Sequence, residues 1–169
     1  KAPNTITATT PITGLNAGDN VIGIDVRPKD GLLYALTRAG VLYTVDPASG
    51  AATQKATLSA DPADPTAPFT AITGTVFSVD FNPAADRLRV IGDGGQNLRI
   101  VPDTGATTSD GDINRAGAAP LLLASAYTNS FDGAASTMLF NLDARSDVLA
   151  LQGPPNDRTL ATRRLCRGT

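Results

Sequence analysis

Short runs in which every second residue is apolar recur along the chain. In the run VIGIDV, which starts at Val21, the apolar side chains at the second, fourth and sixth positions share one face of an extended strand. The run VFSVDF, which starts at Val76, has the same pattern. Alternation with a period of two predicts β-strands. Gly, Pro, Asp and Asn separate the runs, and no useful stretch has a helical period, so the chain is expected to be all-β.

The strand pattern belongs to a longer sequence repeat that occurs twice. The segment VIGIDVRPKDGLLYALTRAGVLYTVDPASGAATQKATL aligns with VFSVDFNPAADRLRVIGDGGQNLRIVPDTGATTSDGDI, with one extra residue near Gln96. A weaker third copy begins at ASAYTN and continues through TMLFNLD, DVLALQ and TLATRRL. Each copy holds four strand-like runs, and four antiparallel strands in a repeat of roughly 40 to 55 residues are typical of a β-propeller blade.

With one further strand in TITATTPI, the sequence predicts a propeller-like array of about three blades plus one strand. The array forms a single domain over residues 1–160, followed by an Arg-rich tail over residues 161–169. A β-sandwich is the alternative fold, because it also uses short strands with regular turns.

The recurring Asp25 and Asp80 lie near the end of the first strand of each copy, on the face opposite the large apolar residues. We expect them to be scaffold groups that accept hydrogen bonds from the backbone N–H groups of the corner that follows. DTGA, from Asp103 to Ala106, matches the local signature of aspartic proteases. The first copy has a Pro- and Gly-containing turn there, and no second DTG exists, so the motif is interpreted as a hairpin turn.

Composition removes several kinds of chemistry. The chain has 169 residues, no His, no Trp, and sixteen acidic residues that are all Asp. The absence of His excludes Ser-His-Asp and Cys-His catalysis. The single Cys excludes an internal disulfide, no apolar run approaches the roughly 20 residues of a membrane span, and a net charge of −2 with no basic stripe argues against nucleic acid. The oxygen ligands that remain, from Asp, Asn and backbone carbonyls, are those of calcium.

The candidate site lies in the loops that do not repeat, because varied loops on a rigid scaffold usually carry binding. DGDIN places Asp110, Asp112 and Asn114 at alternate positions, the opening spacing of a calcium-binding loop, although the EF-hand Gly and Glu are missing. The alternative is a solvated connector. Asp19 and Asp93, from the same set of loops, are the candidate catalytic residues.

The phrases VIGIDVRP, VFSVDFNPAADRLRVIGDGGQNLRIVPDTGA, AYTNSFDGAASTMLFNLD and LQGPPNDRTL together resemble a bacterial family, domain of unknown function 4394. The resemblance covers about residues 12–160 and implies a propeller-like, often secreted protein, with no established activity to carry over. Family members usually have strands before the point where this chain begins, so the chain is expected to be a piece of a longer ancestor.

Two functions from different classes fit these observations. The first is a calcium-dependent hydrolase of lactones or related esters, such as an acyl-homoserine lactone, by analogy with six-bladed propellers that hold calcium near the tunnel mouth. The second is a non-catalytic extracellular binding module, and a structural fragment without activity is a third. The expected location is extracellular or periplasmic. Three blades plus one strand leave open sheet edges, so a homo-oligomer, most simply a dimer, is expected.

Overall fold

The computed structural model describes residues 4–115, 119–153, 156 and 159–163. The described residues form no helix, and therefore no helix that could cross a membrane. They form thirteen β-strands: β1 (Val21–Val26), β2 (Leu33–Thr37), β3 (Val41–Val45), β4 (Ala52–Thr57), β5 (Ser59–Ala60), β6 (Phe77–Asn82), β7 (Arg87–Gly92), β8 (Asn97–Ile100), β9 (Ala106–Asp110), β10 (Leu122–Tyr127), β11 (Leu139–Asp143), β12 (Val148–Gln152) and β13 (Leu160–Arg163).

The strands build three sheets in chain order. Sheet 1 has the order β1-β2-β3-β4, sheet 2 the order β5-β9-β8-β7-β6 and sheet 3 the order β10-β11-β12-β13. All neighbours are antiparallel except β5, which pairs in parallel with β9. The prediction of an all-β chain with three successive sets of four strands is confirmed. The extra strand is not where it was expected, because residues 5–12 form no strand and the thirteenth strand is the short β5.

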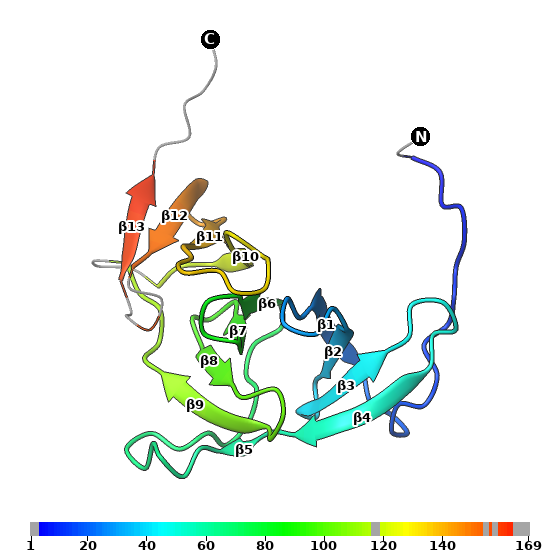
Figure 1. Ribbon diagram of the computed structural model, residues 1–169. Helices are drawn as coiled ribbons and strands as arrows, with labels where there is room; N and C mark the ends of the chain where they lie inside the picture. The colour runs from blue at the N-terminus through cyan, green and yellow to red at the C-terminus, as the bar shows by residue number, and fades with distance from the viewer. Residues whose placement is uncertain (1–3, 116–118, 154–155, 157–158, 164–169) are drawn as a thin grey trace.

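The three sheets pack face to face in sequence. Figure 1 shows β1, β6 and β10 gathered near the centre, with β4, β9 and β13 at the outside. β6 contacts both β1 and β10. Between sheets 1 and 2 lies an apolar core that includes Tyr34, Leu36, Phe81 and Leu88, and a second core lies between sheets 2 and 3 around Ile91. Sheet 2 is therefore packed on both of its faces, whereas sheets 1 and 3 each pack one face on it.

A segment that enters a sheet also touches the outer strand of that sheet. Thr13 forms a parallel bridge with Ala51, just before β4, and Asn114 forms one with Thr159, just before β13. The parallel pairing of β5 with β9 is the equivalent contact in sheet 2. The segment that precedes each sheet is therefore paired in parallel with the outer strand of that sheet or with the residue just before it.

The DTGA motif lies where the incoming chain contacts sheet 2. Its Asp and Thr belong to the turn between β8 and β9, and Gly105 has a φ of +78°. A Cβ atom on Gly105 would collide with the carbonyl oxygen of Thr57, and one on the equivalent Gly50 would collide with that of Pro11. Glycine is needed at both turns because only it combines a left-handed φ with so close an approach of the incoming chain.

The predicted tail from residue 161 begins within β13, which continues to Arg163. The rest of the tail, with its single Cys, lies outside the described residues.

Candidate functional site

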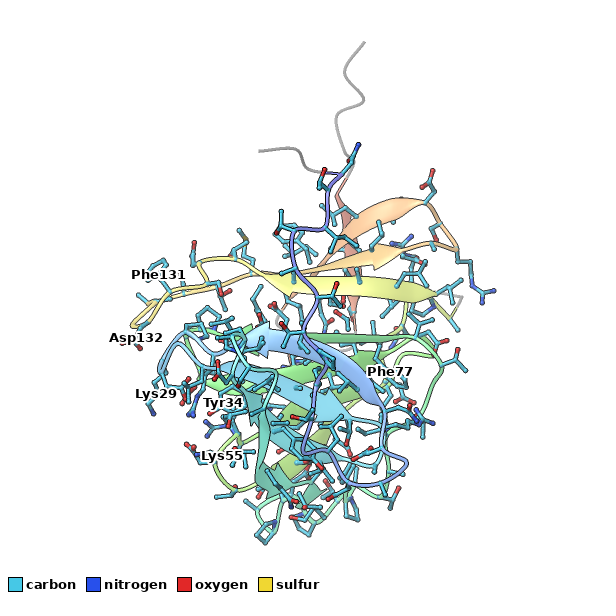
Figure 2. The ribbon with its side chains drawn as sticks, turned by 90° about the vertical axis from the view of Figure 1, so that its right-hand side faces the viewer. Lys29, Tyr34, Lys55, Phe77, Phe131 and Asp132 are labelled. Atoms are coloured by element: carbon cyan, nitrogen blue, oxygen red, sulfur yellow. The ribbon has the colours of Figure 1, made fainter. Side chains whose placement is uncertain are left out.

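The turns of the three sheets sort into two ends. In a four-stranded antiparallel meander, the turns after the first and third strands lie at one end, and the turn after the second strand lies at the other. We call these the corner end and the loop end; the connectors between sheets belong to the loop end. Figure 2 shows Lys29, Tyr34, Lys55, Phe131 and Asp132 toward the corner end and Phe77 toward the loop end.

The five candidate residues all belong to the loop end. Asp19 precedes β1, and Asp93 lies between β7 and β8. Asp110 ends β9, and Asp112 and Asn114 follow it in the connector to β10. The structure does not gather them into one cluster: within the described residues, no three Asp or Cys side chains are close enough to hold a metal ion together. Each candidate therefore has to be judged by its own contacts.

Asp19 has one satisfied and one unsatisfied carboxylate oxygen. Its Oδ1 accepts hydrogen bonds from the backbone N–H of Asn20 at 3.1 Å and of Ala39 at 3.4 Å. Its Oδ2 is buried and has no hydrogen-bond partner among the described residues. A buried acceptor without a donor is costly, and a bound cation or water would relieve that cost.

Asp93 is fully engaged in holding its loop. Its Oδ1 accepts hydrogen bonds from the backbone N–H of Thr75 at 3.0 Å and of Gly94 at 3.1 Å, and its Oδ2 accepts one from the Thr75 hydroxyl at 2.6 Å. The hydrogen bonds from Thr75, first of all from its hydroxyl, lower the pKa of the Asp93 carboxyl. A carboxylate with a lowered pKa is a weak base, so these contacts suit an anchor better than a proton acceptor.

Asp110 is paired with two arginines. Its Oδ2 lies 2.6 Å from Nη1 of Arg89 and its Oδ1 lies 3.0 Å from Nη2 of Arg99, and the side chain is only 7% exposed. The exposed Asn114 donates from its side-chain amide to the backbone oxygen of Asp112 at 3.4 Å. Two guanidinium groups neutralise the charge that a calcium ion would need from Asp110, so the three residues of DGDIN fit such an ion poorly.

Arg89 is a buried residue that the sequence analysis did not select. It is 2% exposed and lies between sheets 2 and 3. Besides Asp110, it donates to the hydroxyl of Tyr127 at 3.1 Å, to Oδ1 of Asn97 at 2.8 Å and to Oδ1 of Asn156 at 2.7 Å. These hydrogen bonds make the junction polar. An arginine in the middle of the strand RLRVIG was the available signal, because it stands where the alternation places a buried side chain.

A second buried arginine closes the corner end. Arg27 is 3% exposed and forms a bidentate pair with Asp86, at 2.7 Å and 2.6 Å. It also contacts Asp103 at 3.1 Å and Asp30 at 3.1 Å. Lys29 adds a contact to Asp86. This ion network joins sheets 1 and 2, and its carboxylates Asp30, Asp86 and Asp103 are already paired with arginine or lysine.

The scaffold carboxylates Asp25 and Asp80 do not take their main hydrogen bonds from the corners that follow them, as the sequence suggested. Oδ2 of Asp25 accepts from the backbone N–H of Phe81 at 2.7 Å, and Oδ2 of Asp80 accepts from that of Tyr127 at 2.6 Å. Asp25 adds a bond from the backbone N–H of Val26 in its own strand. Both carboxylates therefore join neighbouring sheets, since the packing brings the first strands together.

Burial raises the pKa of the Asp80 carboxyl to about 7, and the nearby charge of Asp25 raises it as well, while the N–H of Tyr127 acts in the opposite direction. Burial also raises the pKa of Asp25. Burial therefore shifts the protonation of both carboxyl groups in the same direction, toward the neutral form.

Three hollows open at the loop end. One of about 290 Å³ lies beside Asn16, Asp19 and Asn20, and one of about 380 Å³ lies beside Thr70 and Ile72. Arg38 lines both; its guanidinium stacks on the ring of Phe77 at 5.1 Å and donates to the backbone oxygen of Gly74 at 3.0 Å. The third, of about 520 Å³, is lined mainly by polar residues: Asp64, Thr66, Ala67, Ser109, Asp110, Gly111, Asp112 and Asn156.

Comparison with known proteins shows the family to which the chain belongs. No curated protein matches the chain. A family model described as "Domain of unknown function (DUF4394)" matches residues 1–165, which is nearly the whole chain. The chain that folds into these three successive sheets therefore belongs to the family of the domain of unknown function DUF4394.

Proposed function

We propose that the three sheets are successive blades of a β-propeller and that the chain is a binding module for a polar, hydroxyl-rich ligand such as a glycan. Each sheet contains a four-stranded meander whose first strand, β1, β6 or β10, is the innermost, and this order supports a blade arrangement. The hydrogen bonds from Phe81 to Asp25 and from Tyr127 to Asp80 repeat from one junction to the next. Such a repeat supports a common rotation between blades more than a two-layer sandwich.

The polar groups at the loop end are the observation that favours a polar, hydroxyl-rich ligand. The hollows of about 520 Å³ and 290 Å³ present amide, carboxylate, hydroxyl and guanidinium groups from loops that differ between the repeats. The hollow of about 380 Å³ adds the Thr70 hydroxyl beside Arg38 to a lining of mainly apolar residues. Polar side chains of this kind make the directional hydrogen bonds that sugar hydroxyls need. Their openness to solvent suits an extended ligand that lies across several loops.

The test is calorimetric titration with a panel of soluble oligosaccharides. Asn16→Ala and Thr70→Val, which remove polar groups from the two hollows beside Arg38, are expected to weaken binding of the recognised sugar at least about tenfold, the equivalent of one good hydrogen bond. The control is Asp132→Asn, an exposed residue at the corner end. If no oligosaccharide binds, or if the control weakens binding equally, the proposal is wrong.

A calcium-dependent hydrolase of lactones or related esters is the second candidate, and one observation favours it. The buried, unpaired Oδ2 of Asp19 could accept a cation, with amide oxygens of Asn16 and Asn20 near the same hollow. A calcium ion there would polarise the carbonyl of an ester. The residues of this chain would bind and orient the substrate in the hollow beside Arg38.

Thermal melts with calcium or a chelator, together with hydrolysis of an acyl-homoserine lactone, test this candidate. Asp19→Asn is expected to abolish both the calcium-dependent shift in melting temperature and the turnover. Asp112→Asn, an exposed matched change at the same end, is expected to leave both unchanged. A protein whose melting temperature ignores calcium would rule the candidate out.

A further inference from the structure

The first and last sheets each leave one apolar face without a sheet packed on it among the described residues. On sheet 3, the face directed away from sheet 2 is made by Ala124, Ala126, Phe140, Leu142, Leu149 and Leu151. We call this the forward face of sheet 3; Leu142 is 42% exposed on it. On sheet 1, the rear face, directed away from sheet 2, carries Ile24 and Val26, which are 55% and 48% exposed.

The two junctions within the chain follow one geometric pattern. At each junction a second-strand side chain, paired across the sheet with a first-strand residue, reaches the next sheet. Tyr34 is paired with Asp25 and meets the ring of Phe81 edge to face, with centroids 5.2 Å apart. Arg89 is paired with Asp80 and donates to the hydroxyl of Tyr127.

Sheet 3 has an equivalent second-strand side chain, but among the described residues no further sheet lies against it. Phe140 is paired with Ala126 and occupies the position of Tyr34 and Arg89. Tyr34 contacts Phe81 in sheet 2, and Arg89 contacts Tyr127 in sheet 3. The equivalent position in sheet 1 is Val26. Phe140 and Val26 are therefore the two halves of a third junction of the same kind.

Sheet 1 has a hollow where such a side chain would fit. A cavity of about 470 Å³ on its rear face is lined mainly by apolar residues, including Val26, Leu33 and Val45. The corresponding residues of sheet 2 are Phe81, Leu88 and Ile100, and all three are buried under sheet 1. The segment before β1 borders this cavity on the side of the outer strands, because Thr13 bridges the lining residue Ala51 and Asn16 donates to Tyr43. The equivalent connectors of sheets 2 and 3 also contact the outer strands, and the cavity beside Val26 stays open.

The chemistry of the faces also matches. Away from the Arg27 ion network at its corner end, the junction between sheets 1 and 2 is apolar on both sides. The junction between sheets 2 and 3 combines the apolar cluster around Ile91 with polar groups: the hydroxyl of Ser78 bonds the backbone of Ser125, and Ser125 and Gln152 bond Asn141. The two free faces are both apolar, so they suit each other, whereas the partly polar forward face of sheet 2 is already matched.

We propose that a second copy of this chain packs its rear sheet-1 face onto the forward face of sheet 3, with Phe140 of one copy in the cavity beside Val26 of the other. The inference rests on the blade arrangement proposed above. The reciprocal junction closes the ring, so that two chains supply six blades. Six is the only multiple of three among the roughly four to eight blades of ordinary propellers, which selects a dimer.

The first experiment measures mass by light scattering at micromolar concentration. The wild-type chain is expected at twice 17.3 kDa. Leu142→Asp and Val26→Asp, at exposed positions that should tolerate the change while monomeric, are each expected to reduce the measured mass by half. Phe131→Asp, which changes a 58% exposed aromatic residue at the corner end, is the matched control and is expected to remain a dimer.

Mixing the two monomeric variants tests the head-to-tail geometry. Leu142→Asp keeps an intact sheet-1 face and Val26→Asp keeps an intact sheet-3 face, so the mixture can form one good junction and is expected to regain dimer that neither variant forms alone. In a Cys166→Ser background, Phe140→Cys with Val26→Cys is expected to give a disulfide-linked dimer on mild oxidation. A monomeric wild-type chain, a larger oligomer, a dimeric Leu142→Asp protein, or no recovery in the mixture would each overturn the proposal.

Discussion

The Oδ2 atom of Asp80 lies 2.6 Å from the backbone nitrogen of Tyr127, which donates a hydrogen bond to it across the junction between sheets 2 and 3. Asp25 accepts from Phe81 in the same way one sheet earlier. Because β1, β6 and β10 run side by side at these junctions, each carboxyl group fixes how far one sheet can slide along the next. The equivalent residue of sheet 3 is Ala126, so this device is missing from its forward face.

Asp80 is expected to make the protein less stable as the pH rises. Its pKa is about 7 in the folded state and about 3.8 in the unfolded state, because burial disfavours the charged form. Between these values the folded state binds more protons than the unfolded state, so the free energy of unfolding falls from about pH 4 to about pH 7 and then levels off. Urea midpoints measured across this range should show the decline.

The matched variant is Asp80→Asn, which keeps an acceptor for the N–H of Tyr127 but cannot ionise. It is expected to flatten most of this pH dependence, leaving the smaller effect in the same direction from Asp25. An unchanged slope in the variant would show that other groups cause it. A slope of the opposite sign in the wild-type protein would show that Asp80 is better solvated than its burial indicates.

Arg27 is expected to govern stability at the acid end of the range. Hydrogen bonds from Arg27, more than those from Lys55, lower the pKa of the Asp103 carboxyl to about 2, and Arg27 also lowers the pKa of Asp86. Groups with lowered pKa values stabilise the fold above about pH 4 and lose that effect as the pH falls toward about pH 2. Together with Asp80, this places maximum stability at about pH 4 to 5.

Arg27→Gln tests the network directly. It is expected to cost about 1–3 kcal/mol at neutral pH, the range for a lost charged hydrogen-bond network whose carboxylates remain partly solvated. It should also weaken the acid transition, as measured by urea midpoints between neutral and acidic pH. The control is Lys29→Gln, an exposed partner of Asp86, which is expected to change stability by less than about 0.5 kcal/mol.

The fold follows from local sequence more closely than the contacts between sheets do. The strand alternation and the two aligned copies predict the order of the twelve longer strands, because strand formation depends on local pattern and turn chemistry. The alternation also places Asp25 and Asp80 on the correct face. It could not reveal that their donors are Phe81 and Tyr127, because these belong to the neighbouring sheet, about one repeat away along the chain.

Two turn glycines allow the cost of a left-handed φ to be measured separately from the cost of a steric clash at Cβ. Gly105→Ala places a Cβ against the carbonyl oxygen of Thr57 in addition to the cost of its left-handed φ. Gly31 has a similar φ of +69° but open space around its Cβ position, so Gly31→Ala measures the φ cost alone. We expect a loss of about 1–2 kcal/mol for Gly31→Ala and clearly more for Gly105→Ala. Equal losses from urea unfolding would show that the segment before β5 moves aside at no cost.

The candidate site was less predictable from the sequence than the fold. The spacing of Asp110, Asp112 and Asn114 suggests convergent ligands, but spacing carries no information about what else approaches them. Arg89 and Arg99 come from β7 and β8 and reach Asp110 because the antiparallel register places all three side chains on one face of sheet 2. The opposite case is Asp19, whose unpaired oxygen depends on how its loop folds against Ala39.

Asp110→Asn distinguishes a scaffold carboxylate from a calcium ligand. If Asp110 serves mainly to neutralise Arg89 and Arg99, the variant leaves the 2% exposed Arg89 with a buried charge that is only partly compensated, and the cost is expected to be about 3 kcal/mol. The loss should be the same with calcium and with a chelator, in thermal or urea unfolding. Asp112→Asn, two residues away and exposed, provides the baseline and is expected to be nearly neutral. If chelator instead destabilises the wild-type protein and has no effect on Asp110→Asn, the carboxylate holds an ion, and the ion pairs with Arg89 and Arg99 must open to admit it.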